Sequence, residues 1–169
     1  KASSNRASSL SPGHKLQTDE VITMDSGMIE FVFEQTGVHA IATAPLSLTA
    51  HQVDRIFLDR GDVKLHVPPQ GVGFVVETAE RKITDLGTSF VVSAKPDTSR
   101  VFVLDGEVEI GEEEGSHGRL MTKGEVAKIG KNGNIKLLSE ATQGLPERED
   151  TAIPFSPGNL RGQIFGIKS

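Results

Sequence analysis

The sequence contains no cysteine, no tryptophan and no tyrosine. The absence of cysteine excludes disulfides, zinc-thiolate sites and thiol nucleophiles. The aromatic residues are eight phenylalanines, which argues against an aromatic platform for sugars or single-stranded nucleic acid. The sequence also has no run of about 18 apolar residues, so we expect no direct membrane insertion by this fragment.

The charge and the length of the chain narrow the possible class of protein further. The net charge is −5, and the lysines and arginines are scattered rather than clustered, so nucleic acid is not an expected partner. The chain starts at Lys1 without a methionine or an apolar signal segment, as the cut edge of a longer protein would. Its 169 residues suit one domain. We expect a flexible lead-in over 1–9, a β domain over 10–139 and an irregular tail or linker over 140–169.

Short segments rich in β-branched residues alternate with turn residues along the chain, most clearly between Phe74 and Gly106. Alternation of apolar and polar residues with period two is typical of strands that bury one face. At least ten such segments predict an all-β, single domain of short, mostly antiparallel strands. We expect these strands to form a sandwich, or a flattened β-roll or solenoid-like barrel.

Turn signals predict where the strands end. Pro45 is expected to interrupt one segment, and Asp59-Arg60-Gly61 to end another. Asp105-Gly106 and Asn132-Gly133 are typical of tight hairpins. A weak repeat, Gly-(Asp/Glu)-Val, begins at Gly61, Gly106 and Gly124. We attribute it to shared turn chemistry, in which glycine permits a positive φ, the acidic residue faces solvent and valine is the first inward residue.

Several residues could take part in catalysis or metal binding, but their spacing does not match that of such a site. The run Glu112-Glu113-Glu114 lacks the alternating oxygen ligands of a calcium loop and indicates a solvated loop. No Gly-x-Ser-x-Gly elbow occurs, and no glycine-rich phosphate loop precedes a helix. We therefore expect no catalytic residue, no cofactor and no metal. Isolated surface histidines are expected instead of a metal site, at His14, His39, His51, His66 and His117.

The group Asp85-Leu86-Gly87-Thr88 is the one that most invites a catalytic interpretation. In that interpretation Asp85 is a general base and Thr88 a nucleophile. The alternative is a turn, in which the Asp85 carboxylate accepts main-chain N–H groups, Gly87 takes a left-handed conformation and the Thr88 hydroxyl completes the bonding. We favour the turn, because local bonding is the usual role of these residue types.

An ordered set of short patterns resembles the FecR-type domain. They are F-x-V-x-T from Phe74, D-L-G-T-x-F-x-V from Asp85, V-x-V-L-x-G-x-V-x-I from Val101 and L-x-x-x-G-E from Leu120. With weaker similarity upstream, the resemblance covers roughly residues 10–130. The structural turn and core positions of the set are Phe74, Asp85, Gly87, Thr88, Phe90, Gly106 and Gly124.

The resemblance implies a non-enzymatic signalling module. In the FecR family such a domain is the extracytoplasmic, periplasmic part of a membrane-anchored protein that controls a sigma factor. The partner would then be an envelope or outer-membrane protein. The patterns consist mainly of turn and core positions, so they identify no partner-binding residue. The alternative is a structural or adhesive cell-surface β module that supports a neighbouring domain, such as a carbohydrate-binding one.

Overall fold

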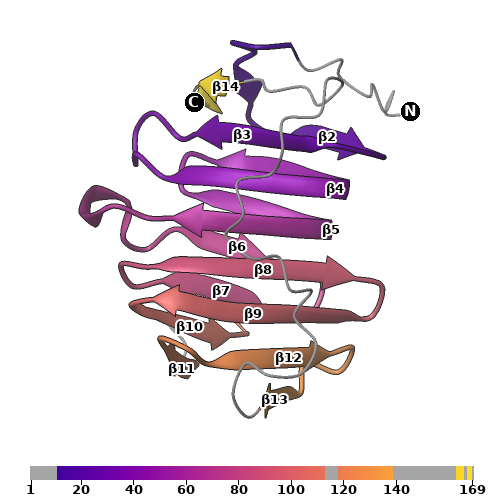
Figure 1. Cartoon of the computed structure of the whole chain (residues 1–169), viewed down its shortest axis with the longest axis vertical. Coiled ribbons are helices and arrows are strands. Elements are labelled where there is room, and N and C mark those ends of the chain that lie inside the picture. The colour runs from indigo at the N-terminus through magenta and orange to yellow at the C-terminus, as the bar shows by residue number, and fades with distance from the viewer. Residues whose placement is uncertain (1–10, 113–117, 139–162, 166, 169) are drawn as a thin grey trace.

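The computed structural model describes residues 11–112, 118–138, 163–165 and 167–168. Most of them belong to one sheet of 13 strands, and two short strands form a second sheet. The large sheet is curled into a half-barrel (Figure 1). Most neighbouring strands are antiparallel. The predicted all-β fold of ten or more mostly antiparallel strands is confirmed.

The strands follow one another with short connections, and the described residues contain no helix apart from a single 3-10 turn, Pro69–Gly71. No helix in this part of the chain is long and apolar enough to cross a membrane. The strands are β1 Leu16–Gln17, β2 Glu20–Met24, β3 Met28–Val32, β4 His39–Gln52, β5 Arg55–His66, β6 Val75–Glu77, β7 Lys82–Asp85, β8 Ser89–Lys95, β9 Thr98–Asp105, β10 Glu107–Gly111, β11 Arg119–Thr122, β12 Val126–Gly130, β13 Ile135–Leu138, β14 Gln163–Phe165 and β15 Ile167–Lys168.

The sheet has two walls that share strand β5. The order along the sheet is β11-β10-β7-β6-β5-β8-β9-β12-β13. We call β8, β9, β12 and β13 the front wall and β6, β7, β10 and β11 the back wall; Figure 1 shows the latter behind the former. Residues 55–57 of β5 pair with β6, whereas residues 61–66 pair with β8. Strand β5 therefore bends from one wall to the other, and β4 pairs along both of its halves.

The repeated Gly-(Asp/Glu)-Val pattern marks the points where the chain changes wall. Gly61 lies at the bend of β5, Gly106 joins β9 to β10, and Gly124 precedes β12. Their φ angles are 119°, 81° and 88°, a region that favours glycine. The valine that follows each acidic residue is buried, at Val63, Val108 and Val126. The repeat thus comes from a shared corner conformation.

Two turn predictions were wrong for the same reason. Asp105-Gly106 does not form a hairpin, because β9 pairs with β8 and β12 while β10 pairs with β7 and β11. Asp59-Arg60-Gly61 does not end a strand, because β5 continues through the bend. In both places the glycine redirects the strand across the core.

At the other two turn signals the structure agrees more closely with the prediction. Strand β4 runs through Pro45, but its register with β5 shifts between Thr43 and Ser47, so the proline disturbs the ladder without ending the strand. Asn132-Gly133 does lie in a hairpin turn, since β12 and β13 are antiparallel neighbours. The Gly133 amide donates to the Gly130 carbonyl at 2.7 Å, and Gly133 has a φ of 71°.

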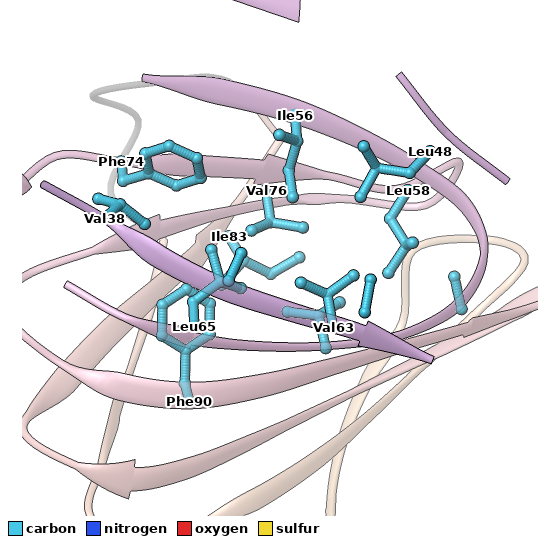
Figure 2. Packing of buried hydrophobic residues seen from close by; sticks show 14 of the residues in the cluster. Val38, Leu48, Ile56, Leu58, Val63, Leu65, Phe74, Val76, Ile83 and Phe90 are labelled. Carbon is cyan, nitrogen blue, oxygen red and sulfur yellow. The ribbon is translucent and has the colours of Figure 1, made fainter. Parts of the chain in front are cut away.

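The core fills the space between the walls. Buried residues alternate with partly exposed ones along β8 and β9, so each strand turns one apolar face inward. Figure 2 shows buried side chains of both walls packed together, among them Leu65, Phe74, Ile83 and Phe90. The rings of Phe33 and Phe74 meet edge to face with centroids 4.8 Å apart, an arrangement favoured by the ring quadrupoles.

The last described segments return to the start of the sheet. Strand β14 pairs in parallel with β3, and β15 pairs in parallel with β1. These two pieces of the predicted tail therefore dock on the N-terminal end of the fold (Figure 1). The expected lead-in over 1–9 and the rest of the expected tail over 140–169 lie outside the described residues.

Candidate functional site

The Asp85 to Thr88 group forms a corner between the walls, because β7 ends at Asp85 and β8 begins at Ser89. Alternation along β7 places Ile83 and Asp85 on the same inward face, and both are fully buried. The Asp85 carboxylate, through Oδ2, accepts a hydrogen bond of 2.8 Å from the main-chain N–H of Gly87. Gly87 has a φ of 101°, as the turn interpretation requires.

Main-chain hydrogen bonds tie this corner to the segments on either side. The Asp85 amide donates to the Phe74 carbonyl at 2.9 Å, and the Gly73 amide donates to the Asp85 carbonyl at 3.0 Å. The Leu86 amide donates to the Glu107 carbonyl at 3.1 Å. Three successive connections between the walls therefore meet at this corner: β5 to β6, β7 to β8 and β9 to β10.

Two buried oxygens at the corner have no hydrogen-bond partner within the described structure: Asp85 Oδ1 and Thr88 Oγ1. The prediction that the Thr88 hydroxyl completes the turn was therefore wrong. Burial raises the pKa of Asp85 from its ordinary value of 3.8 to about 7, against the opposing effect of the Gly87 and Thr88 N–H groups. A carboxyl group in this position is protonated more readily than an exposed one.

The geometry favours a structural role for this corner. Asp85 is 0% exposed and Thr88 is 3% exposed, so neither group is open to a substrate from solvent. A general base must also lie within hydrogen-bond reach of the proton that it removes, and the Thr88 hydroxyl has no such partner. The remaining turn and core positions are placed accordingly: Phe74 and Phe90 are fully buried, Gly106 packs against the corner, and Gly124 has a positive φ.

The outer surface of the corner is apolar, which the sequence analysis missed. Val72 is 52% exposed and Leu86 is 41% exposed. The Val72 side chain lies 3.6 Å from the position that a Cβ on Gly87 would occupy. The flanking Gly71 and Gly73 were a signal for this, because glycines on both sides of a valine indicate an irregular segment that cannot bury it in a strand.

The four histidines that the structure describes each contact a different polar side chain. His14 contacts Glu20 at 2.8 Å, His51 contacts Asp19 at 2.8 Å, and the His66 ring lies 2.8 Å from the Ser89 hydroxyl. His39 contacts Glu30. The part of the chain that the structure describes contains no group of three or more metal-ligating side chains. His117 and the glutamates at 113 and 114 lie outside it.

One protein family matches the part of the chain that contains the corner. The model of the family described as FecR protein matches residues 34–109. The resemblance to the FecR-type domain is confirmed over residues 34–109. The match runs from the residues before β4 into β10 and includes the corner, but it is narrower than the resemblance over 10–130. No curated protein matches the chain.

Solved structures share the fold of this chain. Two crystal structures of a candidate anti-sigma factor from Parabacteroides distasonis ATCC 8503, at 1.65 and 2.50 Å resolution, are similar to it. Their sequences are 20% and 21% identical, and both superpose with a TM-score of 0.58 over 73% of this chain. The chain spans 61% of the length of each of those structures.

A shallow polar depression of about 180 Å³ lies beside the β6–β7 turn of the FecR-type domain. Several of its charges are paired within the fold, since Glu77 pairs with Arg55 at 3.1 Å and with Lys82 at 3.3 Å. Arg81 pairs with Glu112 at 2.9 Å and donates from Nε to the Gly133 carbonyl at 3.1 Å. Arg81 thus ties the back wall to the β12–β13 turn.

Two buried threonines give a paired test of the corner. Thr88→Val is expected to raise the free energy of unfolding by about 1 kcal/mol, because it removes a buried hydroxyl without a partner and keeps the shape. Thr78→Val is the matched control: its hydroxyl bonds to Arg81 and Glu80, so the same change is expected to cost about 1–2 kcal/mol. Urea denaturation measures both, and equal signs for the two changes would contradict the account of the corner.

Proposed function

We propose that this chain is the signal-receiving domain of a sigma-factor regulator and that it works by binding a protein partner. The observation that carries the proposal is the FecR match over residues 34–109, which includes strands of both walls. The fold shared with a candidate anti-sigma factor supports it. Because the chain spans 61% of that structure, sigma-factor control belongs to the proposal for the whole protein.

Family membership also motivates a cellular setting. We place the domain in the periplasm, in a membrane-anchored parent protein, with an envelope or outer-membrane protein as its partner. The chemistry of the corner agrees with binding rather than turnover, since its two polar groups are closed to solvent. The described part of the domain instead presents sheet edges and exposed apolar residues such as Val72, Leu86 and Leu120, which are features that serve recognition.

The proposal is tested by affinity capture with the purified full chain as bait in an envelope extract of the organism that encodes it. Capture of an identifiable envelope protein by the folded chain is the expected result. Gly87→Val is the misfolded control, because valine is strained at a φ of 101°. If the folded chain captures polysaccharide or nothing, protein relay by this domain is wrong, and the scaffold alternative takes its place.

A further inference from the structure

Three basic residues lie side by side on the outer face of the front wall. Lys128 of β12 pairs with Arg100 of β9 and, on its other side, with Lys136 of β13. Paired residues of neighbouring strands point to the same face of a sheet. That face is the outer one, because the preceding residues Ser99 and Ala127 are fully buried and successive side chains alternate. We call Arg100, Lys128 and Lys136 the basic row; its strands lie together at one end of the sheet (Figure 1).

The two lysines of the basic row are not neutralised within the described structure. Both are exposed, and neither has an ion pair with any residue that the structure describes. The next position along the row is the neutral Ser93, and Asp62 follows only beyond it, on β5. Like charges directly opposite each other in a sheet are destabilising. The row is therefore a cost to the fold unless a negatively charged group binds there.

Protection of a sheet edge explains one of these charges but not the others. Strand β13 is the last strand in the order of the sheet, and a lysine on an edge strand discourages pairing with another chain. This accounts for Lys136. Lys128 and Arg100 lie on β12 and β9, which have a neighbour on both sides, so edge protection does not apply to them.

Partly exposed apolar residues adjoin the basic row on the same face. Phe102 follows Arg100 by two residues on β9, so its side chain points to the same side of the sheet. Val91 of β8 pairs with Phe102, and both side chains are partly exposed. The outer face thus offers positive charge and apolar contact next to each other, a combination that suits an acidic peptide with apolar residues better than a free anion.

We propose that the basic row, with the adjoining Val91 and Phe102, is a docking surface for an extended acidic segment of a protein partner. Carboxylates of the segment would pair with Lys128 and Lys136, and an apolar side chain between them would contact Phe102. Complementary charge of this kind sets the choice of partner and the rate of association. This inference rests on the proposed function and names the surface that the protein partner would use.

The size and setting of the row favour a short acidic peptide over a large polyanion. Neighbouring strands lie about 4.8 Å apart, so the row extends over about 10 Å. Acidic side chains at alternate positions of an extended peptide lie about 7 Å apart on one side, which matches that scale. A nucleic acid or an anionic membrane would extend well beyond the row, where the chain's net charge of −5 repels it.

A variant that removes both lysines tests the surface without disturbing the core. In the full chain, Lys128→Gln with Lys136→Gln leaves Arg100 in place, because Arg100 takes part in another interaction. Urea unfolding should show that this row variant is at least as stable as the wild type, because repulsion along the row is relieved. Lys15→Gln with Lys123→Gln is the matched control, since it removes two exposed positive charges outside the row.

The probe is a fluorescently labelled synthetic peptide, Gly-Ser-Glu-Val-Glu-Phe-Glu-Ser-Gly. At low ionic strength, fluorescence polarisation should show that it binds the wild type and the control about fivefold or more tightly than the row variant. The difference should vanish at about 0.5 M salt. Equal binding by the three proteins, or no binding by any of them, would overturn the docking surface.

Two other occupants would show themselves in the same set of proteins. Vesicles that contain phosphatidylglycerol and bind the wild type but not the row variant, without peptide binding, would assign the row to a membrane and overturn the protein partner. A concentration-dependent dimer of the wild type that the row variant does not form would assign the row to a second copy and overturn it as well.

Affinity capture from the envelope extract separates this inference from the proposed function. Capture of the same identified envelope protein by the wild type and the row variant alike would leave the proposed function standing and refute the basic row as its surface. Row-dependent peptide binding without capture of any envelope protein would support the surface and refute the proposed function. Capture that is lost in the row variant and kept in the control would support both.

Discussion

Gly106→Ala is expected to lower the free energy of unfolding of the FecR-type domain by about 3–5 kcal/mol, combining backbone strain and overpacking. Gly106 has a φ of 81°, where an alanine is strained. A Cβ added there would lie 2.4 Å from the Gly87 carbonyl oxygen and 2.7 Å from Thr88 Cγ2. The first of these contacts is with main chain, and Gly87 and Thr88 are themselves held in the corner, so the clash cannot be relieved by a rotamer change.

Gly124→Ala is the control that separates the two costs. Gly124 has a φ of 88°, close to that of Gly106, but nothing lies within 4 Å of the position of an added Cβ. The expected loss there is about 1–2 kcal/mol from backbone strain alone. Urea unfolding of both variants gives the comparison. Equal losses in the two variants would mean that the close contact of Gly106 with Gly87 and Thr88 adds nothing to the cost.

The contrast between these two glycines shows what the sequence could and could not predict. Period-two alternation predicted the strands, because the inward residues of β8 and β9 are set by local pattern. The repeat at Gly61, Gly106 and Gly124 predicted a positive φ at each corner. The strand partners could not be predicted, because two similar dipeptides behave differently: Asn132-Gly133 closes a hairpin, whereas Asp105-Gly106 crosses the core.

The burial of Asp85 was predictable in part. The sequence Lys82-Ile83-Thr84-Asp85 places Asp85 on the face of Ile83, which is an inward face. What local pattern does not reveal is which segments flank Asp85 in the sheet. They are β10, whose Val108 pairs with Asp85, and the segment before β6, whose Phe74 carbonyl accepts a hydrogen bond from the Asp85 amide. Both contacts depend on wall crossings, so the unusual carboxyl environment emerges only from the tertiary structure.

Stability of the domain is expected to fall as pH rises from about 4 to about 7, because Asp85 has a higher pKa in the folded state than its ordinary 3.8. The folded protein then binds the proton more tightly than the unfolded chain. The resulting stabilisation is fully present below the unfolded pKa and is lost as pH rises through the folded pKa of about 7. A rise of about three pKa units corresponds to about 4 kcal/mol.

Asp85→Asn is the variant that isolates this effect from the titration of other carboxylates. The amide is neutral at every pH, and its oxygen can accept the Gly87 N–H bond that Asp85 Oδ2 accepts now. The variant should exceed the wild type in stability by up to about 4 kcal/mol at pH 8 and by about 1 kcal/mol or less at pH 4. Urea unfolding across this range measures the difference between the two proteins. Parallel profiles would show that Asp85 keeps an ordinary pKa, and the corner would then have to admit water or a cation to its buried carboxylate, because an isolated buried charge is too costly to persist.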